Sequence, residues 1–464
     1  MTTKKLRHAM ITFLALILAA ALLVPAGSTA AKPQAQEGSE GIPTDRIIIK
    51  YREGTSAQAD PSASALMSSL SAAAGVPLEY ARPMSGDAHV LKLSERLPES
   101  QVEAISASLM TLPGVEYAEP DRIKRPALIP NDAYYSSDQW NLMLDTVADG
   151  NGVAYGINAE PAWDITTGSA GVVVAVVDSG ITSHEDLKPD RIVPGYDFIG
   201  TDGSFGGVLK YFTANDGDGR DNDPTDSGDW ITDSENDGTD PVTGTFFQGC
   251  GVSDSSWHGV HVAGIIGAWS DNSLGIAGVD WNAKILPVRV LGKCGGYTSD
   301  IADGIRWAAG LPVSGAPANA YPAKVINLSL GGPGACSVTE QNAINDAVNV
   351  KGAVVVAAAG NENVDASSYS PGNCNNVITV AANDRLGYRA DYSNYGSVVE
   401  ISAPGGGNGQ GGILSTVNGG TTTPNGDSEY AYKAGTSMAA PHVSGVVSLM
   451  FAVNPWMTPA HVLE

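Results

Sequence analysis

Short apolar runs without regular alternation recur through the chain from residue 131 onward. They are Val172–Val177, Ile285–Leu291, Lys324–Leu330, Ala353–Ala358, Val377–Ala382 and Val398–Ser402. A strand that is apolar on both faces belongs to a parallel sheet with helices on each side. Helical patterns lie between the runs, at Thr298–Ala309 and Thr339–Val350. The sequence therefore predicts an open, mainly parallel sheet of the α/β class, in which active sites form at the carboxyl ends of strands.

A smaller unit with a different pattern of apolar and polar residues precedes this sheet, between Asp45 and about Pro126. Its pattern predicts strands and helices in the order Arg46–Tyr51 (strand), Ala63–Gly75 (helix), His89–Leu93 (strand), Glu99–Thr111 (helix) and Val115–Pro120 (edge strand). By composition alone this α+β unit fits any small binding module.

The first 30 residues have the layout of a secretory signal. Basic residues at Lys4, Lys5 and Arg7 precede an apolar run, Met10–Val24, and small residues follow up to Ala30. The run is shorter than the roughly 20 residues that a membrane-spanning helix needs. We expect export with cleavage near Ala30, no membrane anchor, and a polar linker over residues 31–41.

Charge and cysteine content narrow the function further. The formal net charge of −24 argues against non-specific binding to nucleic acids or anionic membranes, which needs a basic surface. Four cysteines in an exported chain favour disulfides over free thiols, and all three pairings stay open. A zinc site lacks support because no Cys-x-x-Cys pair occurs among Cys250, Cys294, Cys336 and Cys374. Gly405–Gly412 is typical of a flexible loop.

Two candidate catalytic residues lie where predicted elements begin or end. Asp178 follows the first apolar run and precedes a Ser-Gly turn, although a lone Asp there is more often a cap. His258 begins the small-residue segment HGVHVAG, which predicts an imidazole at the start of a closely packed helix. His261, inside that segment, is typical of a core histidine rather than a metal ligand.

Two further candidates have comparable positions. Ser437 lies in GTSMAAP, and Pro441 is tolerated only in a first helical turn, so we expect Ser437 at a helix N-terminus. Asn361 follows the strand predicted at Ala353–Ala358, where a turn Asn is the alternative. Together the four residues supply a nucleophile, a base, an orienting acid and an oxyanion donor.

The segments VVDSGI, HGVHVAG, VINLSLGG, AAAGN and GTSMAAPHVSG, in this order, resemble the subtilase family of serine peptidases. The resemblance implies a subtilisin-like fold and a catalytic triad of Asp178, His258 and Ser437, with Asn361 as oxyanion donor. It implies that Ser329, Leu330 and Gly331 pair with a peptide substrate and line its main specificity pocket. The expected function is a secreted serine endopeptidase that forms an acyl-enzyme on Ser437.

The resemblance also implies how the precursor is divided. Residues 42–129 look like a pro-region, which in this family assists folding and inhibits the enzyme, and residues 130–464 look like the peptidase domain. Bridges Cys250–Cys294 and Cys336–Cys374 are implied by the family's secreted bacterial members. We expect a monomer that acts on protein substrates.

Two features depart from the family pattern. Val260 stands where a Thr or Ser usually follows the His-Gly pair. The chain ends at Glu464, where family members continue, so an incomplete peptidase domain is expected. A non-catalytic binding protein is therefore the main rival, and an ester hydrolase is weaker because no Gly-x-Ser-x-Gly segment surrounds Ser437.

Calcium is the expected structural cofactor, at two sites. The first follows the resemblance to thermitase-like members and takes carboxylates from Asp132 and Asp186, the Asn272 side chain, and main-chain oxygens of Trp269, Leu274 and Ile276. The second is an acidic insertion whose carboxylates repel one another without a cation; its expected ligands are Asp197, Asp216, Asp221, Asp223 and Asp226. Hard oxygen ligands suit calcium better than zinc.

Overall fold

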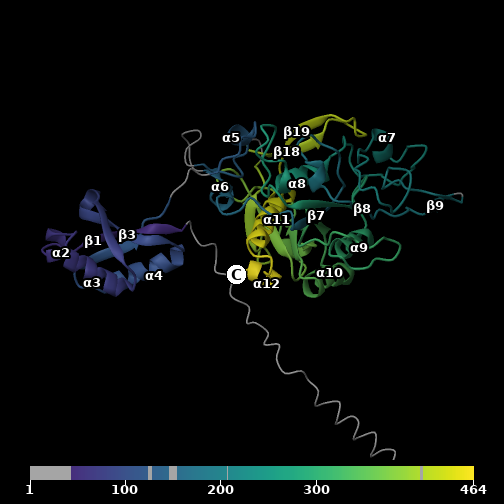
Figure 1. Cartoon of the computed structure of the whole chain (residues 1–464). Helices are drawn as coiled ribbons and strands as arrows, with labels where there is room; N and C mark the ends of the chain where they lie inside the picture. The colour runs from purple at the N-terminus through teal and green to yellow at the C-terminus, as the bar shows by residue number, and fades with distance from the viewer. Residues whose placement is uncertain (1–42, 124–127, 146–153, 206, 408–410, 464) are drawn as a thin grey trace, which may run out of the picture. The chain divides into compact units, whose positions relative to one another are not determined.

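The computed structural model describes residues 43–123, 128–145, 154–205, 207–407 and 411–463. The predicted signal segment and linker, residues 1–41, lie outside this part, as does the middle of the predicted Gly405–Gly412 loop. Contacts divide the chain into two units, Met1–Ile123 and Lys124–Glu464 (Figure 1). This division falls slightly before the predicted boundary at residue 129.

The first unit is a four-stranded antiparallel sheet with helices, as the α+β prediction requires. Its strand order is β2-β3-β1-β4. Alternate residues of β1, namely Ile47, Ile49 and Tyr51, are buried against Val102 and Leu109 of the second long helix. The elements are β1 (Thr44–Tyr51), α2 (Ser56–Ala59), α3 (Ser64–Ala74), β2 (Leu78–Pro83), η1 (Ser85–Asp87), β3 (Ala88–Leu97), α4 (Glu99–Met110) and β4 (Val115–Pro120). Strand β2 was missed because only its first residue is buried.

The second unit is built on a seven-stranded parallel sheet, which confirms the predicted fold class. Its strand order is β17-β16-β14-β12-β7-β11-β8. The strands are β7 (Val173–Asp178), β8 (Tyr196–Asp197), β11 (Lys284–Arg289), β12 (Val325–Leu328), β14 (Val354–Ala358), β16 (Ile378–Asn383) and β17 (Ile401–Pro404). The chain adds β8 and β11 on one side of β7 and then crosses to β12 on the other. This reversal beside β7 is where parallel sheets form binding sites.

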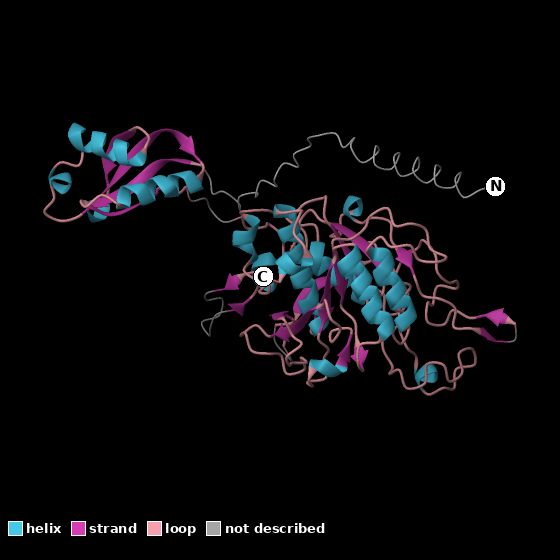
Figure 2. Cartoon of the chain, turned by 90° about the horizontal axis from the view of Figure 1, so that it is seen from below, coloured by secondary structure: helices cyan, strands magenta, loops and turns pink. Residues whose placement is uncertain are grey.

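Helices cover both faces of the sheet, as the apolar strands demand (Figure 2). Val174 and Val176 of β7 share a core with α8 (His258–Gly267) and α11 (Thr436–Val453). Their neighbours Ala175 and Val177 face the opposite core, which contains α9 (Thr298–Ala308) and α10 (Val338–Asn345). Both faces of β7 are buried for this reason, and the strand shows no alternation of apolar and polar residues.

Shorter elements complete the second unit. They are α5 (Tyr135–Asp138), β5 (Leu144–Asp145), β6 (Ala154–Tyr155), α6 (Ala159–Trp163), η2 (Pro189–Arg191), β9 (Ser204–Phe205), β10 (Val208–Leu209), α7 (Asp233–Asn236), β13 (Gly332–Pro333), η3 (Asp346–Val350), η4 (Ala366–Ser368), β15 (Tyr369–Ser370), β18 (Ile413–Asn418), β19 (Ser428–Lys433) and α12 (Pro459–Val462). The hairpin of β18 and β19 was not predicted.

Two disulfides close loops around the sheet. Cys250 pairs with Cys294 and Cys336 pairs with Cys374, with Cα–Cα distances of 5.6 and 5.1 Å. These are the pairs that the family resemblance implied. The bridges span 44 and 38 residues, so each removes roughly 4 kcal/mol of loop-closure entropy from the unfolded chain in the chain-entropy model.

Helix α11 is apolar along its whole length. Among the helices that the structure describes, α11 alone is long and apolar enough to cross a membrane, with a mean hydropathy of 1.4. However, 67% of it is buried inside the protein, where Ala439, Val443 and Val447 pack in the core beside β7. Its apolar character is thus accounted for by burial in the core.

Candidate active site

A buried carboxylate and a partly exposed imidazole form the first pair of the site. Asp178 is the last residue of β7, and His258 is the first residue of α8. His258 Nδ1 and Asp178 Oδ1 are 2.7 Å apart, with the Asp178 side chain fully buried and the His258 side chain 23% exposed. Burial lowers the pKa of His258, but the adjacent Asp178 charge and hydrogen bond outweigh it, so the pKa lies above its ordinary value of 6.5.

A second carboxylate supports this pair from behind, and sequence reasoning missed its role there. The Ser179 hydroxyl donates to Asp226 Oδ2 at 2.7 Å and accepts from the Gly259 N–H at 2.9 Å. Since Ser179 follows Asp178 and Gly259 follows His258, this bridge joins the end of β7 to the start of α8. Burial raises the pKa of Asp226 to about 6. Asp226 therefore positions the two elements.

Ser437 is the second residue of α11, so its expected place at a helix N-terminus is correct. The expected place of Pro441 in the first turn is wrong, because it is the sixth residue of the helix. Pro441 has no N–H to give the carbonyl four residues earlier, that of Ser437. This carbonyl instead accepts a hydrogen bond from the Ser329 hydroxyl at 2.7 Å.

The Ser437 hydroxyl has a partner on the same neighbouring segment. It donates to the Ser329 carbonyl oxygen at 3.1 Å. Within the part of the chain that the structure describes, no hydrogen bond joins Ser437 to His258. A rotation about the Ser437 Cα–Cβ bond is therefore needed before the two side chains act together, as is common before substrate binds.

Strand pairing brings the two halves of the site together. Asn327 of β12 lies opposite Val176 of the adjacent parallel strand β7. Beyond this pair, Asp178 ends β7 and Ser329 directly follows the last residue of β12, so both lie at the carboxyl edge of neighbouring parallel strands. Ser329 binds Ser437, and Asp178 binds His258, so the serine and the imidazole are both held at this edge of the sheet.

The Asn361 side chain is fixed at the start of α11. It follows β14 and Gly360, and its Oδ1 accepts from the N–H and the hydroxyl of Thr436 at 2.8 and 3.0 Å. With Oδ1 held in this way, Nδ2 is the group left to donate to a ligand. The N–H of Ser437 lies in the first turn of the helix, where N–H groups have no carbonyl partner within the helix. Asn361 Nδ2 and the Ser437 N–H are thus two available donors at the start of α11.

A cavity of about 580 Å³ adjoins Ser437. Its lining includes Ser329, Leu330 and Gly331, the residues expected to bind substrate, together with Ala358, Gly360 and Asn361. The predicted catalytic serine, oxyanion donor and substrate strand thus line a single space.

Comparison with known proteins identifies the family to which this chain belongs. The family model of the subtilases matches residues 169–463. The chain belongs to the subtilase family. These enzymes are serine proteases. Asp178, His258 and Ser437 all lie within the matched region of this subtilase.

Individual relatives agree with this assignment. The subtilase is 46% identical over 429 residues to an extracellular protease of Xanthomonas campestris pv. campestris, covering 90% of this chain and 67% of the relative. It is 41% identical over 427 residues to an extracellular basic protease of Dichelobacter nodosus, covering 90% of this chain and 65% of the relative. The chain thus spans about two thirds of each. A solved structure of proteases from Pseudoalteromonas arctica has a TM-score of 0.63 and 49% identity, covering 72% of this chain and 90% of that one.

Two other residues of α8, His261 and Val260, are buried in the protein interior. His261 is fully buried, and its Nε2 lies 3.0 Å from the Ala431 carbonyl oxygen, which accords with the expected core histidine. Burial lowers its pKa well below the ordinary value. Val260 is also fully buried in the apolar core. The Val260 side chain, which lacks the hydroxyl usual in the family, therefore packs in the core and does not reach solvent.

The carboxylates of the first expected calcium site lie close together in this subtilase. Asp132 and Asp186 are buried, and the Asp132 charge contributes to a raised Asp186 pKa of about 6, of which burial is the main cause. Asp132 Oδ1 has no hydrogen-bond partner among the described residues, and none of the ion pairs found there involves either carboxylate. Two uncompensated buried carboxylates fit a cation.

The remaining expected ligands of that site surround Asp186. Its oxygens accept from Asn272 Nδ2 at 2.9 Å and the Ile276 N–H at 2.8 Å, and its carbonyl accepts from the Trp269 N–H at 2.7 Å. The Leu274 N–H donates to Asn272 Oδ1 at 2.7 Å. Asn272 thus presents its nitrogen to Asp186, so a bound cation requires its amide to be turned over.

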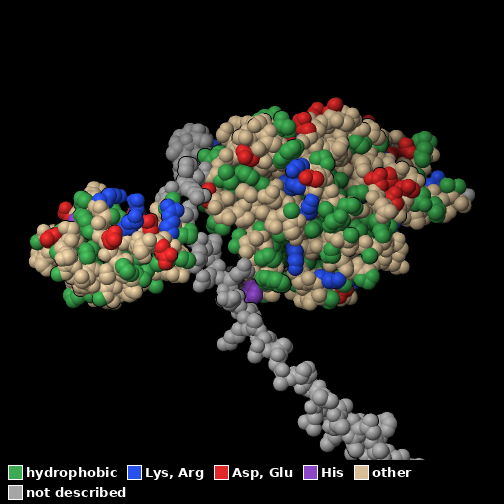
Figure 3. Space-filling view, viewed as in Figure 1, with side chains coloured by type: hydrophobic (Ala, Val, Ile, Leu, Met, Phe, Trp, Pro, Cys, Tyr) green, Lys and Arg blue, Asp and Glu red, His purple; other side chains and the backbone are tan. Residues whose placement is uncertain are grey.

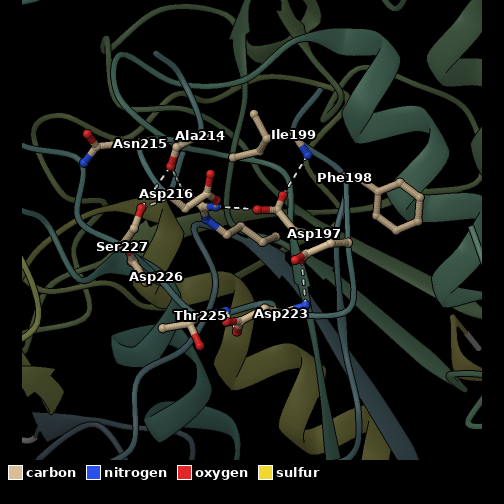
Figure 4. Close-up of polar contacts among 12 residues, drawn as sticks. Asp197, Phe198, Ile199, Ala214, Asn215, Asp216, Asp223, Thr225, Asp226 and Ser227 are labelled. Atoms are coloured by element: carbon tan, nitrogen blue, oxygen red, sulfur yellow. Dashed lines mark hydrogen bonds and ion pairs between the residues drawn. The ribbon is translucent and has the colours of Figure 1, made fainter. Parts of the chain in front are cut away.

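Figure 4 shows Asp197, Asp216, Asp223 and Asp226 of the second expected site. This site also contains a protein cation that sequence reasoning overlooked. Arg289, the last residue of β11, is buried and forms ion pairs with Asp197 and Asp216 through Nη1. Asp221 accepts a hydrogen bond from the main-chain N–H of Asp223 at 2.8 Å, and Asp223 accepts one from the main-chain N–H of Thr225 at 3.0 Å. Arg289 therefore supplies part of the positive charge that the sequence argument assigned to calcium.

Acidic side chains also gather on the surface of this unit (Figure 3). Nevertheless, no group of three or more His, Cys, Asp or Glu side chains suited to a metal ion occurs within the described ranges. The first site offers only two carboxylates, and its other expected ligands are amide and main-chain oxygens. The second site stays a prediction.

Proposed function

We propose that this subtilase is a secreted serine endopeptidase that hydrolyses peptide bonds of proteins through an acyl-enzyme on Ser437. The observation that carries the proposal is that the Asp178–His258 pair and the Ser329–Ser437 pair lie at the carboxyl ends of two adjacent parallel strands, β7 and β12. Nucleophile, base and orienting acid then act as a unit. Protein or peptide chains are the proposed substrates, since Ser329–Gly331, which the family resemblance assigns to peptide pairing, line the cavity together with the nucleophile.

Acylation begins when substrate occupies the cavity. The Ser437 hydroxyl turns from the Ser329 carbonyl to His258 Nε2, which takes its proton as the oxygen bonds to the substrate carbonyl carbon. Asp178 accepts from His258 Nδ1–H, fixes the tautomer, and stabilises the imidazolium without taking a proton. Its full burial keeps water from weakening this interaction.

The tetrahedral intermediate places a negative charge on the former carbonyl oxygen. Asn361 Nδ2 and the Ser437 N–H donate to it, and the start of α11 adds its favourable dipole. The carbon–nitrogen bond then breaks, with the His258 proton passing to the leaving amine. Water attacks the acyl-enzyme by the same steps in reverse, which frees Ser437.

The decisive experiment compares wild type with Ser437→Ala in casein hydrolysis and in labelling by a fluorophosphonate. We expect both to be lost in the variant and kept in Ser204→Ala, which alters an exposed serine elsewhere. Casein hydrolysis by purified Ser437→Ala contradicts the assignment. An inert wild type favours the non-catalytic binding protein, and turnover of small esters without casein favours an ester hydrolase.

The proposal extends to maturation. Residues 1–30 serve as a signal and residues 42–129 as a pro-region that assists folding and inhibits the enzyme until it is removed. The separate core of the first unit supports a domain that folds by itself, and two relatives have names that describe them as extracellular. Mass spectrometry of the secreted protein tests this, because Ser437→Ala should remain an unprocessed precursor.

Calcium is the proposed structural cofactor of the mature enzyme. Asp132 and Asp186 would hold it, together with main-chain oxygens of the Trp269–Ile276 loop. It would neutralise two buried carboxylates and fix the start of the peptidase domain to that loop. We further propose a monomer without a membrane anchor, and the net charge of −24 argues against nucleic-acid partners.

A further inference from the structure

The three residues before His258 form a strained turn that is held from two sides. Trp257 has a φ of 50° and a ψ of 39°, in the left-handed region where a bulky side chain is strained. Its side chain is buried, and its Nε1 donates to the Gly420 carbonyl oxygen at 2.6 Å. The Ser255 N–H donates to the Thr421 carbonyl oxygen at 2.8 Å. The loop between β18 and β19 thus holds one side of the turn.

Asp229 holds the other side of this turn. Its Oδ1 accepts from the Ser256 N–H at 2.5 Å, and its Oδ2 accepts from the Ser256 hydroxyl at 2.6 Å. Both carboxylate oxygens therefore bind one residue, two positions before His258. Asp229 lies in the acidic insertion between β10 and α7. Within the described residues no hydrogen bond joins it to the imidazole, so its effect on position passes through Ser256.

The turn at Trp257 sets the direction of the His258 side chain. Trp257 is the N-cap of α8 and makes no capping hydrogen bond with its side chain. A Cβ atom added to Gly259 would overlap the Gly180 carbonyl oxygen, so the first turn of the helix packs directly on the chain that follows Asp178. A strained residue of this kind persists only where its surroundings fix it. The contacts that fix the turn therefore also fix the imidazole.

We propose that Asp229 is a positioning residue of the active site, which binds Ser256 and so holds the strained turn that aims the His258 imidazole. The inference rests on the proposed endopeptidase function, because this aim matters only if His258 takes the proton of Ser437. It gives the acidic insertion a task besides cation binding. A misplacement of about 1 Å at a reacting group lowers the rate by roughly 100-fold.

Asp229 also acts on His258 through its charge. Burial lowers the pKa of His258 and Asp178 raises it; of the remaining charges, Lys433 on β19 lowers it and Asp229 raises it. His261, further along α8, stays neutral because burial holds its pKa well below the ordinary value. Removing the Asp229 charge should therefore lower the pKa of His258. The neutral imidazole would then persist to lower pH.

The test compares Asp229→Ala with Asp229→Asn in the mature enzyme, by steady-state kinetics on a peptide p-nitroanilide. Asp229→Ala releases Ser256, so kcat should fall by about 100-fold with little change in KM. Asparagine can keep both bonds, because its oxygen accepts from the N–H and its nitrogen donates to the hydroxyl. Asp229→Asn should therefore keep kcat within a few-fold of wild type and move the acid limb of kcat/KM to lower pH.

The matched control is Asp254→Ala, which removes an exposed carboxylate from the same stretch of chain and should change neither kcat nor the acid limb. If Asp229→Ala is not recovered as folded protein, Ser256→Ala takes its place. That variant loses the hydroxyl bond but keeps the Asp229 charge, so it should lower kcat without moving the acid limb.

Three results would overturn the inference while the endopeptidase assignment stands. One is a kcat for Asp229→Ala, or for Ser256→Ala in its place, equal to that of the Asp254→Ala control. Another is a raised KM with unchanged kcat, which would place Asp229 in substrate binding. The third is a loss in Asp229→Asn as large as in the alanine variant. If wild type cleaves neither casein nor the p-nitroanilide, the proposed function fails and the inference with it.

Discussion

Ser329 and Ser437 bind each other twice. The Ser329 hydroxyl donates to the Ser437 carbonyl at 2.7 Å, and the Ser437 hydroxyl donates to the Ser329 carbonyl at 3.1 Å. The first bond is possible because Pro441 leaves the Ser437 carbonyl without its helical donor. Asn327 Nδ2 donates to the Ser329 hydroxyl at 2.9 Å. The nucleophile thus depends on β12 for its position.

Ser329→Ala should lower the free energy of unfolding by about 1–3 kcal/mol, because it leaves the Ser437 carbonyl and the Asn327 amide without a partner. Urea unfolding in the Ser437→Ala background measures this without self-digestion. The matched control is Ser204→Ala, an exposed serine that should change stability little. Equal unfolding midpoints for the two variants would contradict the account.

Asn361→Ala should reduce kcat by about 10²–10³-fold with little change in KM, since the lost donor acts only on the charge of the tetrahedral intermediate. Steady-state kinetics on a peptide p-nitroanilide measures both constants. Asn363→Ala, two residues further and exposed, serves as the control. A kcat equal to that of wild type would remove Asn361 from the site.

The activity should fall as pH is lowered through the pKa of His258, because only the neutral imidazole accepts the Ser437 proton. The Asp178 carboxylate raises this pKa above 6.5, so the acid limb of kcat/KM should lie above 6.5. Asp178→Asn removes the charge, which should shift the limb to lower pH and reduce kcat by about 10⁴-fold. A wild-type limb below 6.5 would show that burial outweighs the Asp178 charge.

Calcium should raise the melting temperature of the Ser437→Ala protein, and a chelator should lower it. At free calcium about 100-fold above Kd, one site stabilises the fold by roughly 2.7 kcal/mol. Asp132→Asn should weaken this response at the first site. Asp223→Asn tests the predicted second site, where an unchanged response would mean that Arg289 alone balances the acidic cluster. Melting indifferent to calcium in the unaltered background rejects both sites.

Val260→Thr should keep activity within a few-fold of wild type while costing about 1 kcal/mol of stability. The side chain is fully buried among apolar residues, so an added hydroxyl must bond to a carbonyl of its own helix or stay unpaired. Thermal unfolding and casein hydrolysis measure the two effects. An inert wild type with an active Val260→Thr protein would instead favour the binding-protein alternative.

The sequence predicted the sheet because its apolar runs reflect local burial on both faces. The end of β7 at Asp178 and the start of α8 at His258 follow from those patterns. Strand β8 was missed since it has only two residues, and the β18–β19 hairpin because its second strand alternates weakly in burial. Short or half-exposed strands carry little pattern of their own.

The order of elements, the sheet and the residues at its carboxyl edge were thus determined by sequence, since propensity and burial act over a few neighbouring residues. Tertiary structure decided the rest: the Ser329–Ser437 pair spans 108 positions, and the Asp226–Ser179 bridge spans 47. It also placed Arg289 among the acidic residues and Asp229 beside Ser256. Such contacts depend on how distant segments pack, which no local pattern encodes.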